Sequence, residues 1–443
     1  MSFFNSVKSR KEAQERWYQL LVDEEDTRAC KDIPQEACSN IAQNFFIILL
    51  TQLLTKIADS LANAKTVLPW ILNASGAPAG MTALLVPIRE SGSMIPQLLI
   101  GGVVRKHKTR KQFYVFGCVA QAIFILCILL SGMYLNGLQS GIAIIFSLVL
   151  FSLSRGLCSV ASKDVIGKTI PKTRRGRLIG ISASISGLLT IVIALLMVFG
   201  IFNQSYNFIP FICLAASFWL IAAFTFSQVK EQDGATEGGG NAFYSAISKF
   251  SLLKTDIVFR NFVVMRALLM SSGLTAPFLV TIVMTSEEMP SSVQLGLFVG
   301  LSGLASLISG HIWGKMSDNN SLRVMIIAGV FCSLICSLAL LFLFLNIKYL
   351  EQFTLVLFFL LMITHEGVRL GRKTYVLDMA SGNKRTDYVT LSNTLIGVLL
   401  LIVGAFTSVL AQYSLLAVFA FFLICSASAA GLGILESNKN LRE

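Results

Sequence analysis

Long apolar segments determine what this chain can fold into. Twelve of them follow one another along 443 residues, each close to the roughly 20 residues that a helix needs to cross a bilayer. A bilayer offers no water to pair with backbone N–H and C=O groups, so such segments must be helical. Charged residues make up 14% of the chain, against about a quarter in soluble domains. The sequence therefore predicts an all-α membrane protein with twelve transmembrane helices, at about 44–70, 79–103, 113–135, 139–162, 178–201, 207–227, 261–285, 291–314, 322–346, 353–376, 388–411 and 414–435.

The connections between these spans alternate in charge. Those after spans two, four, six and ten carry Lys and Arg, whereas those after spans one, three, five and seven carry none. The positive-inside rule therefore places both termini in the cytoplasm, in a plasma membrane or a bacterial inner membrane. The same topology accounts for the net charge of +12 without a nucleic-acid partner.

Two halves of the chain repeat each other. The segments GVVRKHKTRK and GKMSDNNSLR begin at residues 102 and 314, which are 212 apart, and RGLCSVASKD and EGVRLGRKTY begin at residues 155 and 366, which are 211 apart. A constant offset indicates an internal repeat of about six spans. The predicted parts are a cytoplasmic N-terminal arm (1–42), an N-terminal six-helix bundle (43–227), a Gly-rich central cytoplasmic loop (228–260), a C-terminal six-helix bundle (261–436) and a cytoplasmic tail (437–443).

The connection after span eight carries a pattern of Gly314, three residues, Asp318 and a basic end at Arg323. With twelve spans, a six-plus-six repeat and a central loop, this pattern resembles the major facilitator superfamily of secondary transporters. The resemblance covers roughly residues 43–436. It implies two pseudo-symmetric bundles that rock around a central substrate site, and a loop that braces them on the cytoplasmic side.

The first-half copy of this loop departs from the family pattern. Gly102, Arg110 and Lys111 fit, but the Asp position holds Lys106, so the resemblance does not extend to a brace through that Asp. Span four is also similar to the family, because Arg155 lies in the Gly-containing run SRGLCSVAS. The resemblance implies that this Arg influences proton exchange at a carboxylate.

Polar residues follow one face of the first span. Gln52, Lys56, Asp59, Asn63 and Thr66 are spaced four, three, four and three residues apart, which places them on one side of a continuous helix. Charges in mid-span are costly and normally face a water-filled cavity or a partner. We expect Asp59 to titrate or pair in a cavity and Lys56 to contact substrate. A structural Lys56–Asp59 pair is the alternative.

Spans two and four add further charges. Arg89 and Glu90 lie near the middle of span two and point about 100° apart, so one can face span one and the other the cavity. A fixed Arg89–Asp59 or Lys56–Glu90 ion pair is the alternative. In span four, Arg155 and Ser159 belong to a second polar stripe, and the guanidinium fork can bind an anionic group. A purely structural Arg155 also stays open.

Span ten is the main polar contribution of the second half. His365, Arg369 and Arg372 share one face, and Glu366 lies beside them. An imidazole titrates near neutral pH, which suits proton coupling, although a hydrogen-bonded packing role is the alternative for His365. Glu366 is a further coupling candidate. Arg372 is nearer the cytoplasm and can extend its charge to the interface.

These residues predict a secondary transporter rather than an enzyme. The segment VIGKT resembles the end of a phosphate-binding loop, but the first Gly position holds Ser162. We therefore expect an ion gradient as the driving force, with proton coupling through Asp59, Glu90 or Glu366. Candidate cations outnumber carboxylates, which favours a small organic anion or zwitterion as substrate. The alternatives are an exporter or flippase of amphipathic compounds or lipids, and a non-transporting membrane sensor on the same fold.

No catalytic residue, cofactor or metal site is expected. Cys30 and Cys38 lie in the N-terminal arm without a His nearby, and the other seven cysteines lie in apolar segments, where a thiol is usually a small core residue. The expected partners are a small-molecule substrate, a coupling proton and the lipid bilayer, and the expected working unit is a monomer.

Overall fold

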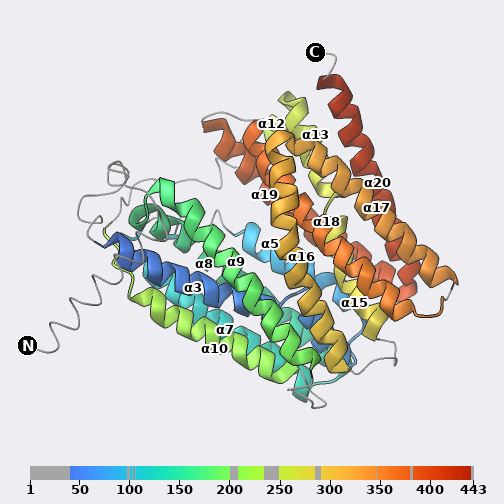
Figure 1. Cartoon of the computed structure of the whole chain (residues 1–443), viewed down its shortest axis with the longest axis horizontal. Helices are drawn as coiled ribbons and strands as arrows, with labels where there is room; N and C mark the ends of the chain where they lie inside the picture. The colour runs from blue at the N-terminus through green and yellow to red at the C-terminus, as the bar shows by residue number, and fades with distance from the viewer. Residues whose placement is uncertain are drawn as a thin grey trace, which may run out of the picture.

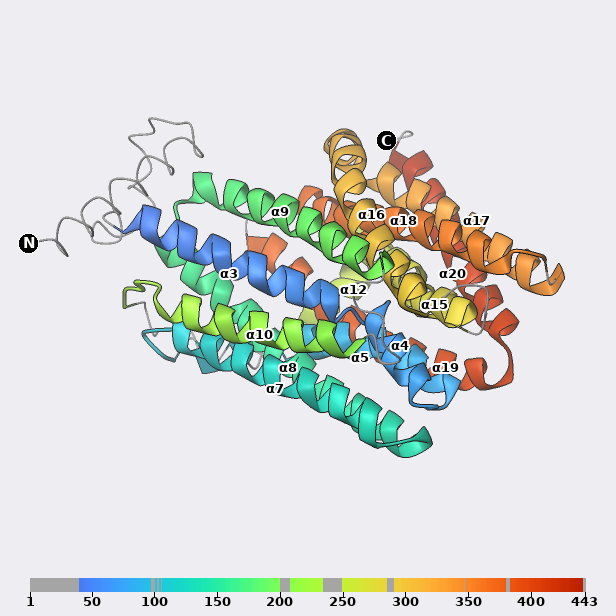
Figure 2. The same cartoon turned by 60° about the horizontal axis from the view of Figure 1, so that its bottom comes forward.

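The computed structural model describes residues 40–96, 100–101, 103–104, 106–199, 208–233, 249–284, 291–345, 347–379 and 383–440, so the predicted arm up to residue 39 lies outside it. Every regular element in these ranges is a helix. Figures 1 and 2 show two bundles, one blue to green and one yellow to red. The first contains α3 (Ile41–Leu61), α4 (Val67–Ala74), α5 (Thr82–Met94), α7 (Lys111–Tyr134), α8 (Gly137–Thr169), α9 (Lys172–Val198) and α10 (Phe208–Ser227). The second contains α13 (Ile257–Leu268), α14 (Ser271–Leu274), α15 (Ala276–Met284), α16 (Ser291–Asn319), α17 (Ser321–Leu345), α18 (Leu350–Asp378), α19 (Asn383–Tyr413) and α20 (Leu415–Asn440), preceded by η2 (Lys249–Ser251) and α12 (Leu252–Thr255).

Eleven segments of the described chain are helical, long and apolar enough to cross a membrane. The predicted second span falls short of that measure because α5 has 13 residues and contains Pro87. The 3-10 turn η1 (Ala79–Met81) precedes α5, and helix is present again at residues 100 and 101. The all-α fold with twelve spans in two bundles is therefore confirmed.

The bundles are apolar both inside and outside. Phe116 and Phe224 on the outer surface are 66% and 69% exposed. Phe151 and Trp219 are fully buried and pack edge to face with ring centroids 5.2 Å apart. Helices that are apolar all round are typical of a membrane environment, where lipid tails cover the outer side chains.

The first span is divided between α3 and α4. The carbonyl of Asn63 accepts the N–H groups of residues 66–68, and its Oδ1 accepts the N–H of Lys65 at 2.8 Å. Pro69 favours the break because it has no N–H to return to residue 65. The prediction of one continuous polar face through Asn63 and Thr66 is therefore wrong, since both residues belong to the break.

Span seven is interrupted in the same way. The short helices α13, α14 and α15 follow one another, and Pro277 lies at the second position of α15. Spans one and seven occupy equivalent positions in the two halves of the chain. In transporters built from repeats, interrupted helices at corresponding positions point to the substrate site.

The two bundles contact each other mainly along two pairs of helices, α5 with α19 and α9 with α16. A Cβ added at Gly404 of α19 would lie 2.4 Å from Cγ of Pro87 in α5, so the backbones approach closely there. Asn73 of α4 donates to Thr281 of α15 at 3.4 Å. The contacts between the halves therefore extend from mid-span toward the ends that the sequence predicts to be extracellular.

Several helices run past their predicted ends. α16 continues through Gly314 to Asn319, and Oδ1 of Asn320 accepts the N–H of Arg323 at 2.9 Å at the start of α17. This is an N-terminal cap, which lets a single residue separate the two helices. The connection predicted between about 314 and 322 is therefore reduced to Asn320. α8 and α20 also extend beyond their predicted spans, to Thr169 and Asn440.

Candidate functional site

Two arginines share the carboxylate of Asp59. Arg89 of α5 is 5% exposed, and its Nη2 lies 2.7 Å from Oδ1 of Asp59. Its Nη1 donates to the carbonyl of Ala62 at 2.5 Å, and its guanidinium lies 5.4 Å from the ring centroid of Phe151. Arg155 of α8 is 3.6 Å from Oδ2 of Asp59, and one third of its side chain is exposed. The carboxylate is thus held tightly by a buried arginine and loosely by an accessible one.

Lys56 contacts neither of its predicted acidic partners in the described chain. Its Nζ donates to Oγ of Ser182 at 2.6 Å and to the carbonyl of Ile179 at 3.3 Å, both on α9. Ser182 in turn donates to Oε1 of Gln52 at 2.9 Å. Gln52 and Lys56 therefore form a polar link between α3 and α9, while Asp59 faces α5 and α8.

Charges from both bundles act on one another at the centre of the protein. Arg155, Lys65, Arg372 and Arg89 all interact electrostatically with Glu90. Lys65, in the break between α3 and α4, interacts with Glu90 and also with Arg369, Glu366 and Arg372 of α18. The sequence analysis did not select Lys65 because it lies off the helical stripe. Pro69, four residues on, is the signal that could have revealed the break around it.

Span ten contains an ion pair within one helix and a histidine that packs against span seven. Glu366 lies 2.5 Å from Arg369, one turn along α18, and the side chain of Arg369 is 45% exposed. Nδ1 of His365 lies 3.0 Å from Oγ of Ser272. A Cβ added at Gly273 would lie 2.8 Å from Cε1 of His365, so the ring is seated closely against the interrupted span seven.

Arg266 of α13 is a further buried cation. It is only 6% exposed. Its guanidinium donates to Ser392 at 2.8 Å and Asn393 at 2.7 Å, both neutral and both on α19. Its Nε has no partner in the part of the chain that is described. Arg266 therefore adds a buried positive charge whose hydrogen-bond partners in the described chain are neutral.

The remaining candidates of the first bundle have structural contacts. Ser159 is half-buried one turn beyond Arg155, and its carbonyl accepts from Oγ of Ser162 at 3.4 Å. Asn63 holds the break in span one through its carbonyl and side chain.

Asp256 ties the start of span seven to α19. Its Oδ1 accepts the N–H of Phe259 at 2.9 Å, which caps α13, and its Oδ2 accepts the hydroxyl of Tyr388. This hydrogen bond, together with burial, raises the pKa of Tyr388 to about 12. The contact lies before the apolar part of α19 begins at Leu391.

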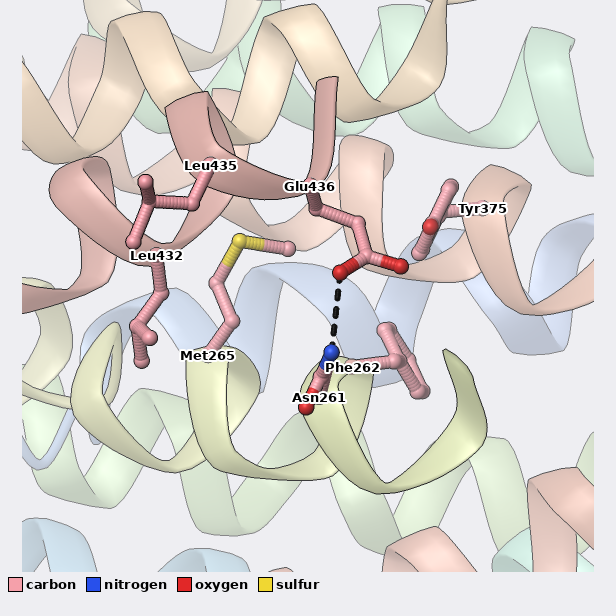
Figure 3. Close-up of a pocket in the computed structure, with 7 residues that line it drawn as sticks. All are labelled: Asn261, Phe262, Met265, Tyr375, Leu432, Leu435 and Glu436. Atoms are coloured by element: carbon pink, nitrogen blue, oxygen red, sulfur yellow. Dashed lines mark hydrogen bonds between the residues drawn. The ribbon is translucent and has the colours of Figure 1, made fainter. Parts of the chain in front are cut away.

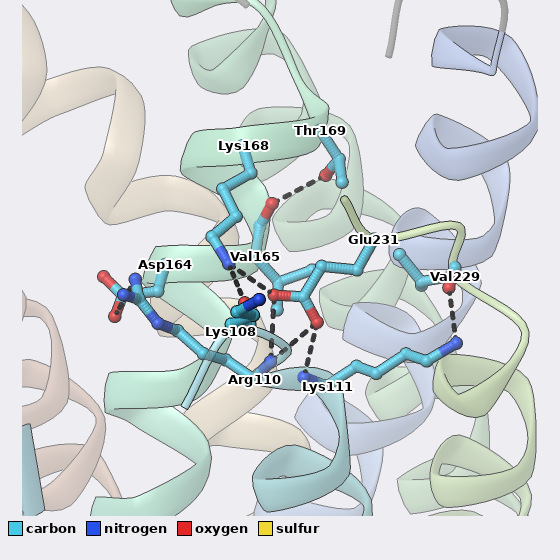
Figure 4. Close-up of polar contacts among 9 residues, drawn as sticks. All are labelled: Lys108, Arg110, Lys111, Asp164, Val165, Lys168, Thr169, Val229 and Glu231. Carbon is cyan, nitrogen blue, oxygen red and sulfur yellow. Dashed lines mark hydrogen bonds and ion pairs between the residues drawn. The ribbon is translucent and has the colours of Figure 1, made fainter. Parts of the chain in front are cut away.

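Figure 4 shows a second polar cluster, around the loop after span two. Nη1 of Arg110 lies 3.0 Å from Oδ2 of Asp164 on α8. The buried carboxylate of Glu231 accepts from Nζ of Lys168 at 2.8 Å and from the backbone N–H groups of Arg110 and Lys111 at 2.7–3.0 Å. Acids of α8 and of the segment after α10 therefore hold a loop whose own Asp position is Lys106.

The structure describes fewer contacts for the other residues of the two loop motifs. Gly102 lies outside the described residues, as does the side chain of Asp318. Gly314 is half-buried in α16, and Arg323 is exposed at the start of α17. The second-half brace that the resemblance implies stays a prediction.

Several solved structures share this fold. A bacterial homologue of the iron transporter ferroportin, in an inward-facing state, matches with a TM-score of 0.64 and 17% identity over 88% of this chain and 98% of that one. A D-xylose–proton symporter matches with a TM-score of 0.65 and 12% identity, over 88% and 97% of the two chains. A peptide transporter in complex with sulfate matches with a TM-score of 0.68 and 13% identity, over 90% and 94%. At these identities the similarity concerns the fold.

Sequence comparison gives the family. An uncharacterized MFS-type transporter of Methanocaldococcus jannaschii is 22% identical over 364 residues, 81% of this chain and 85% of that protein. The sequence profile of the Major Facilitator Superfamily matches residues 45–398. The chain therefore belongs to the major facilitator superfamily of membrane transporters.

Proposed function

We propose that this transporter moves a small organic anion or zwitterion by alternating access and couples the movement to protons. The observation that supports the substrate class is the excess of cations where the two bundles interact. Five cations meet three carboxylates there: Lys65, Arg89, Arg155, Arg369 and Arg372 against Asp59, Glu90 and Glu366. An anionic substrate would reduce this imbalance, whereas a cationic one would increase it.

Arg155 is the preferred anion ligand. Its closest carboxylate oxygen, on Asp59, is 3.6 Å away, which is longer than a hydrogen bond. The planar guanidinium presents a fork that suits a carboxylate or phosphate. Lys65 and Arg372 come from opposite halves and both interact with Glu90, so a substrate among these charges would contact both bundles.

Asp59 is the preferred coupling residue. Its carboxylate competes with an anionic substrate for Arg155, while Arg89 holds it from the other side. Protonation of Asp59 removes that competitor and frees the guanidinium. Proton and anion would then bind together, and release of the proton would return Arg155 to Asp59. We infer proton–substrate symport on this basis.

We also infer how the transporter is oriented in the membrane and how many chains it needs. Both termini in the cytoplasm of a plasma or bacterial inner membrane follow from the Lys- and Arg-rich connections, among them the loop that Glu231 holds. One chain supplies the charges of both halves, so a monomer suffices for function.

The experiment starts from the purified protein. A thermal-shift screen of organic acids, amino acids, nucleosides and sugars identifies ligands, because a bound ligand raises the melting temperature. The ligand found is then followed in proteoliposomes, by counterflow and by uptake driven by a pH gradient. We expect Asp59→Asn to abolish gradient-driven uptake and retain counterflow, and Arg155→Ala to abolish both.

The matched control is Lys163→Ala, which removes an exposed cation two turns further along the same helix as Arg155. Its transport should equal that of the wild type. Unchanged gradient-driven uptake in Asp59→Asn would exclude Asp59 as the coupling residue. Flux of lipid-like cargo that is insensitive to Arg155→Ala would favour the exporter or flippase, and binding without flux would favour the sensor.

A further inference from the structure

A separate pocket lies in the second bundle, away from the central charges. It has a volume of about 230 Å³ and is enclosed by the start of α13, the end of α18 and the end of α20. Figure 3 shows Glu436 and Tyr375 on one side and Leu432 and Leu435 on the other, with Met265 between them and Phe262 below Glu436 and Tyr375. None of these residues belongs to the transport site described above.

Glu436 is the chemically distinctive group of this pocket. It is 9% exposed, and its Oε2 accepts a hydrogen bond from Nδ2 of Asn261 at 2.8 Å. Among the described residues it forms no ion pair with Lys or Arg, and Asn261 supplies the side-chain hydrogen bond to the carboxylate. A carboxylate withdrawn from water requires a cation or several hydrogen-bond donors. The second oxygen is therefore available to a ligand that supplies positive charge and N–H groups.

The lining selects an organic cation over a metal ion. Hard metal ions take six or more oxygen ligands, whereas this pocket offers one carboxylate, one amide and the hydroxyl of Tyr375 among apolar side chains. Aromatic rings such as those of Phe262 and Tyr375 attract an ammonium group through their faces. A primary ammonium can donate to Glu436 and remain in contact with these rings.

The position of the pocket indicates where such an ammonium comes from. Glu436 lies in the last turns of an apolar segment, Leu415–Asn438, and Asn261 lies in the first turns of another, Ile257–Met284. The site is therefore at the membrane surface. Leu432 and Leu435 on its rim are 38% and 62% exposed, as side chains that meet acyl chains would be. Arg260 is exposed and precedes Asn261 near the start of the same apolar segment, where its guanidinium can reach lipid phosphates.

We propose that this pocket binds the headgroup of an amine-bearing phospholipid of the phosphatidylethanolamine type. The ammonium donates to Glu436, the phosphate lies toward Arg260, and the acyl chains run along the outer face of α20. Such a lipid would connect α13 to α20 and α18, and so stabilise the cytoplasm-proximal part of interrupted span seven.

The test uses the full-length protein in nanodiscs of equal amounts of phosphatidylethanolamine and phosphatidylcholine, followed by native mass spectrometry of the retained lipid. The two lipids differ in the N–H groups of the ammonium. We expect about tenfold enrichment of phosphatidylethanolamine, the effect of one charge-assisted hydrogen bond. The N-monomethyl lipid, which keeps N–H groups, should be retained similarly. The melting temperature should also be higher in phosphatidylethanolamine than in phosphatidylcholine.

Glu436→Gln keeps the shape of the side chain and should lose both the enrichment and the difference in melting temperature. Asp233→Asn, which removes an exposed carboxylate, is the matched control and should keep both. If Glu436→Gln does not fold, Leu432→Trp fills the pocket without changing its charge and should also lose the enrichment.

Equal retention of the two lipids by the wild type would overturn the proposal, as would unchanged enrichment in a folded Glu436→Gln protein. If phosphatidylethanolamine is enriched only in the Lys439→Ala, Arg442→Ala double variant, the basic tail of the chain itself occupies the pocket in the wild type. Stabilisation by free ethanolamine to the same extent as by the lipid would assign it to a soluble amine. Either result also rejects the lipid.

Discussion

At the scale of single residues, the centre of this protein is organised around an unequal sharing of Asp59. Arg89 is buried, hydrogen-bonded to a backbone carbonyl at the break in span one, and seated against Phe151. Arg155 reaches the same carboxylate at a longer distance and is partly exposed. Burial and satisfied hydrogen bonds make the first contact structural, whereas the second is free to exchange.

This difference predicts effects of different size on stability for two similar substitutions. Arg89→Met should lower the free energy of unfolding by about 3 kcal/mol, because it leaves a carboxylate and a carbonyl without their buried donor. Arg155→Met should change stability by less than about 1 kcal/mol, since accessible ion pairs contribute little. Melting temperature and monodispersity of the purified variants measure both. Equal destabilisation by the two substitutions would contradict the division of roles.

At the scale of helices, the interface between the bundles depends on small residues that let two helix backbones approach closely. Gly404 of α19 faces Pro87 of α5, and the two backbones approach so closely that a Cβ would overlap the proline ring. α5 is also the helix that carries Arg89 and Glu90. The packing of the two halves and the position of the charged site are therefore linked through one short helix.

Gly404→Leu should separate α5 from α19. It should therefore favour the state of the transport cycle in which these two helices are apart. A loss of about 1.4 kcal/mol at this contact changes the ratio of two states tenfold. Gly431→Leu is the matched control, because a Cβ at that position meets nothing within 4 Å. The measurement is maleimide labelling of a single cysteine at Ser159, from each side of the membrane, in a background without other cysteines. Identical labelling of both glycine variants would contradict a role of this contact in the cycle.

At the scale of the whole molecule, the distribution of positive charge predicts the orientation in the membrane. The loop held by Glu231 and the connections that share its side carry the Lys and Arg residues, and the opposite connections carry almost none. Two exposed positions test this orientation directly, His107 in the basic loop and Asn136 in an uncharged one.

In intact cells, an impermeant maleimide should label Asn136→Cys and leave His107→Cys unmodified until the membrane is permeabilised. The positive-inside rule is the physical reason, since basic loops are retained in the cytoplasm. Both variants are made without other cysteines, and labelling after permeabilisation is the control for accessibility. Labelling of His107→Cys in intact cells would reverse the topology.

The sequence alone determined the class of fold, because apolar length and loop charge are properties that each segment carries by itself. It also located the charged positions of spans one, two, four and ten. The tertiary structure decided how those charges are paired. Lys56 and Asp59 lie on the same helix, yet one contacts Ser182 and the other two arginines. Lys65 and Arg266 joined the polar interior only through a helix break and through burial between helices. Ion pairs inside a membrane form between segments far apart in the chain, so their choice depends on packing, which a pattern along one helix does not contain.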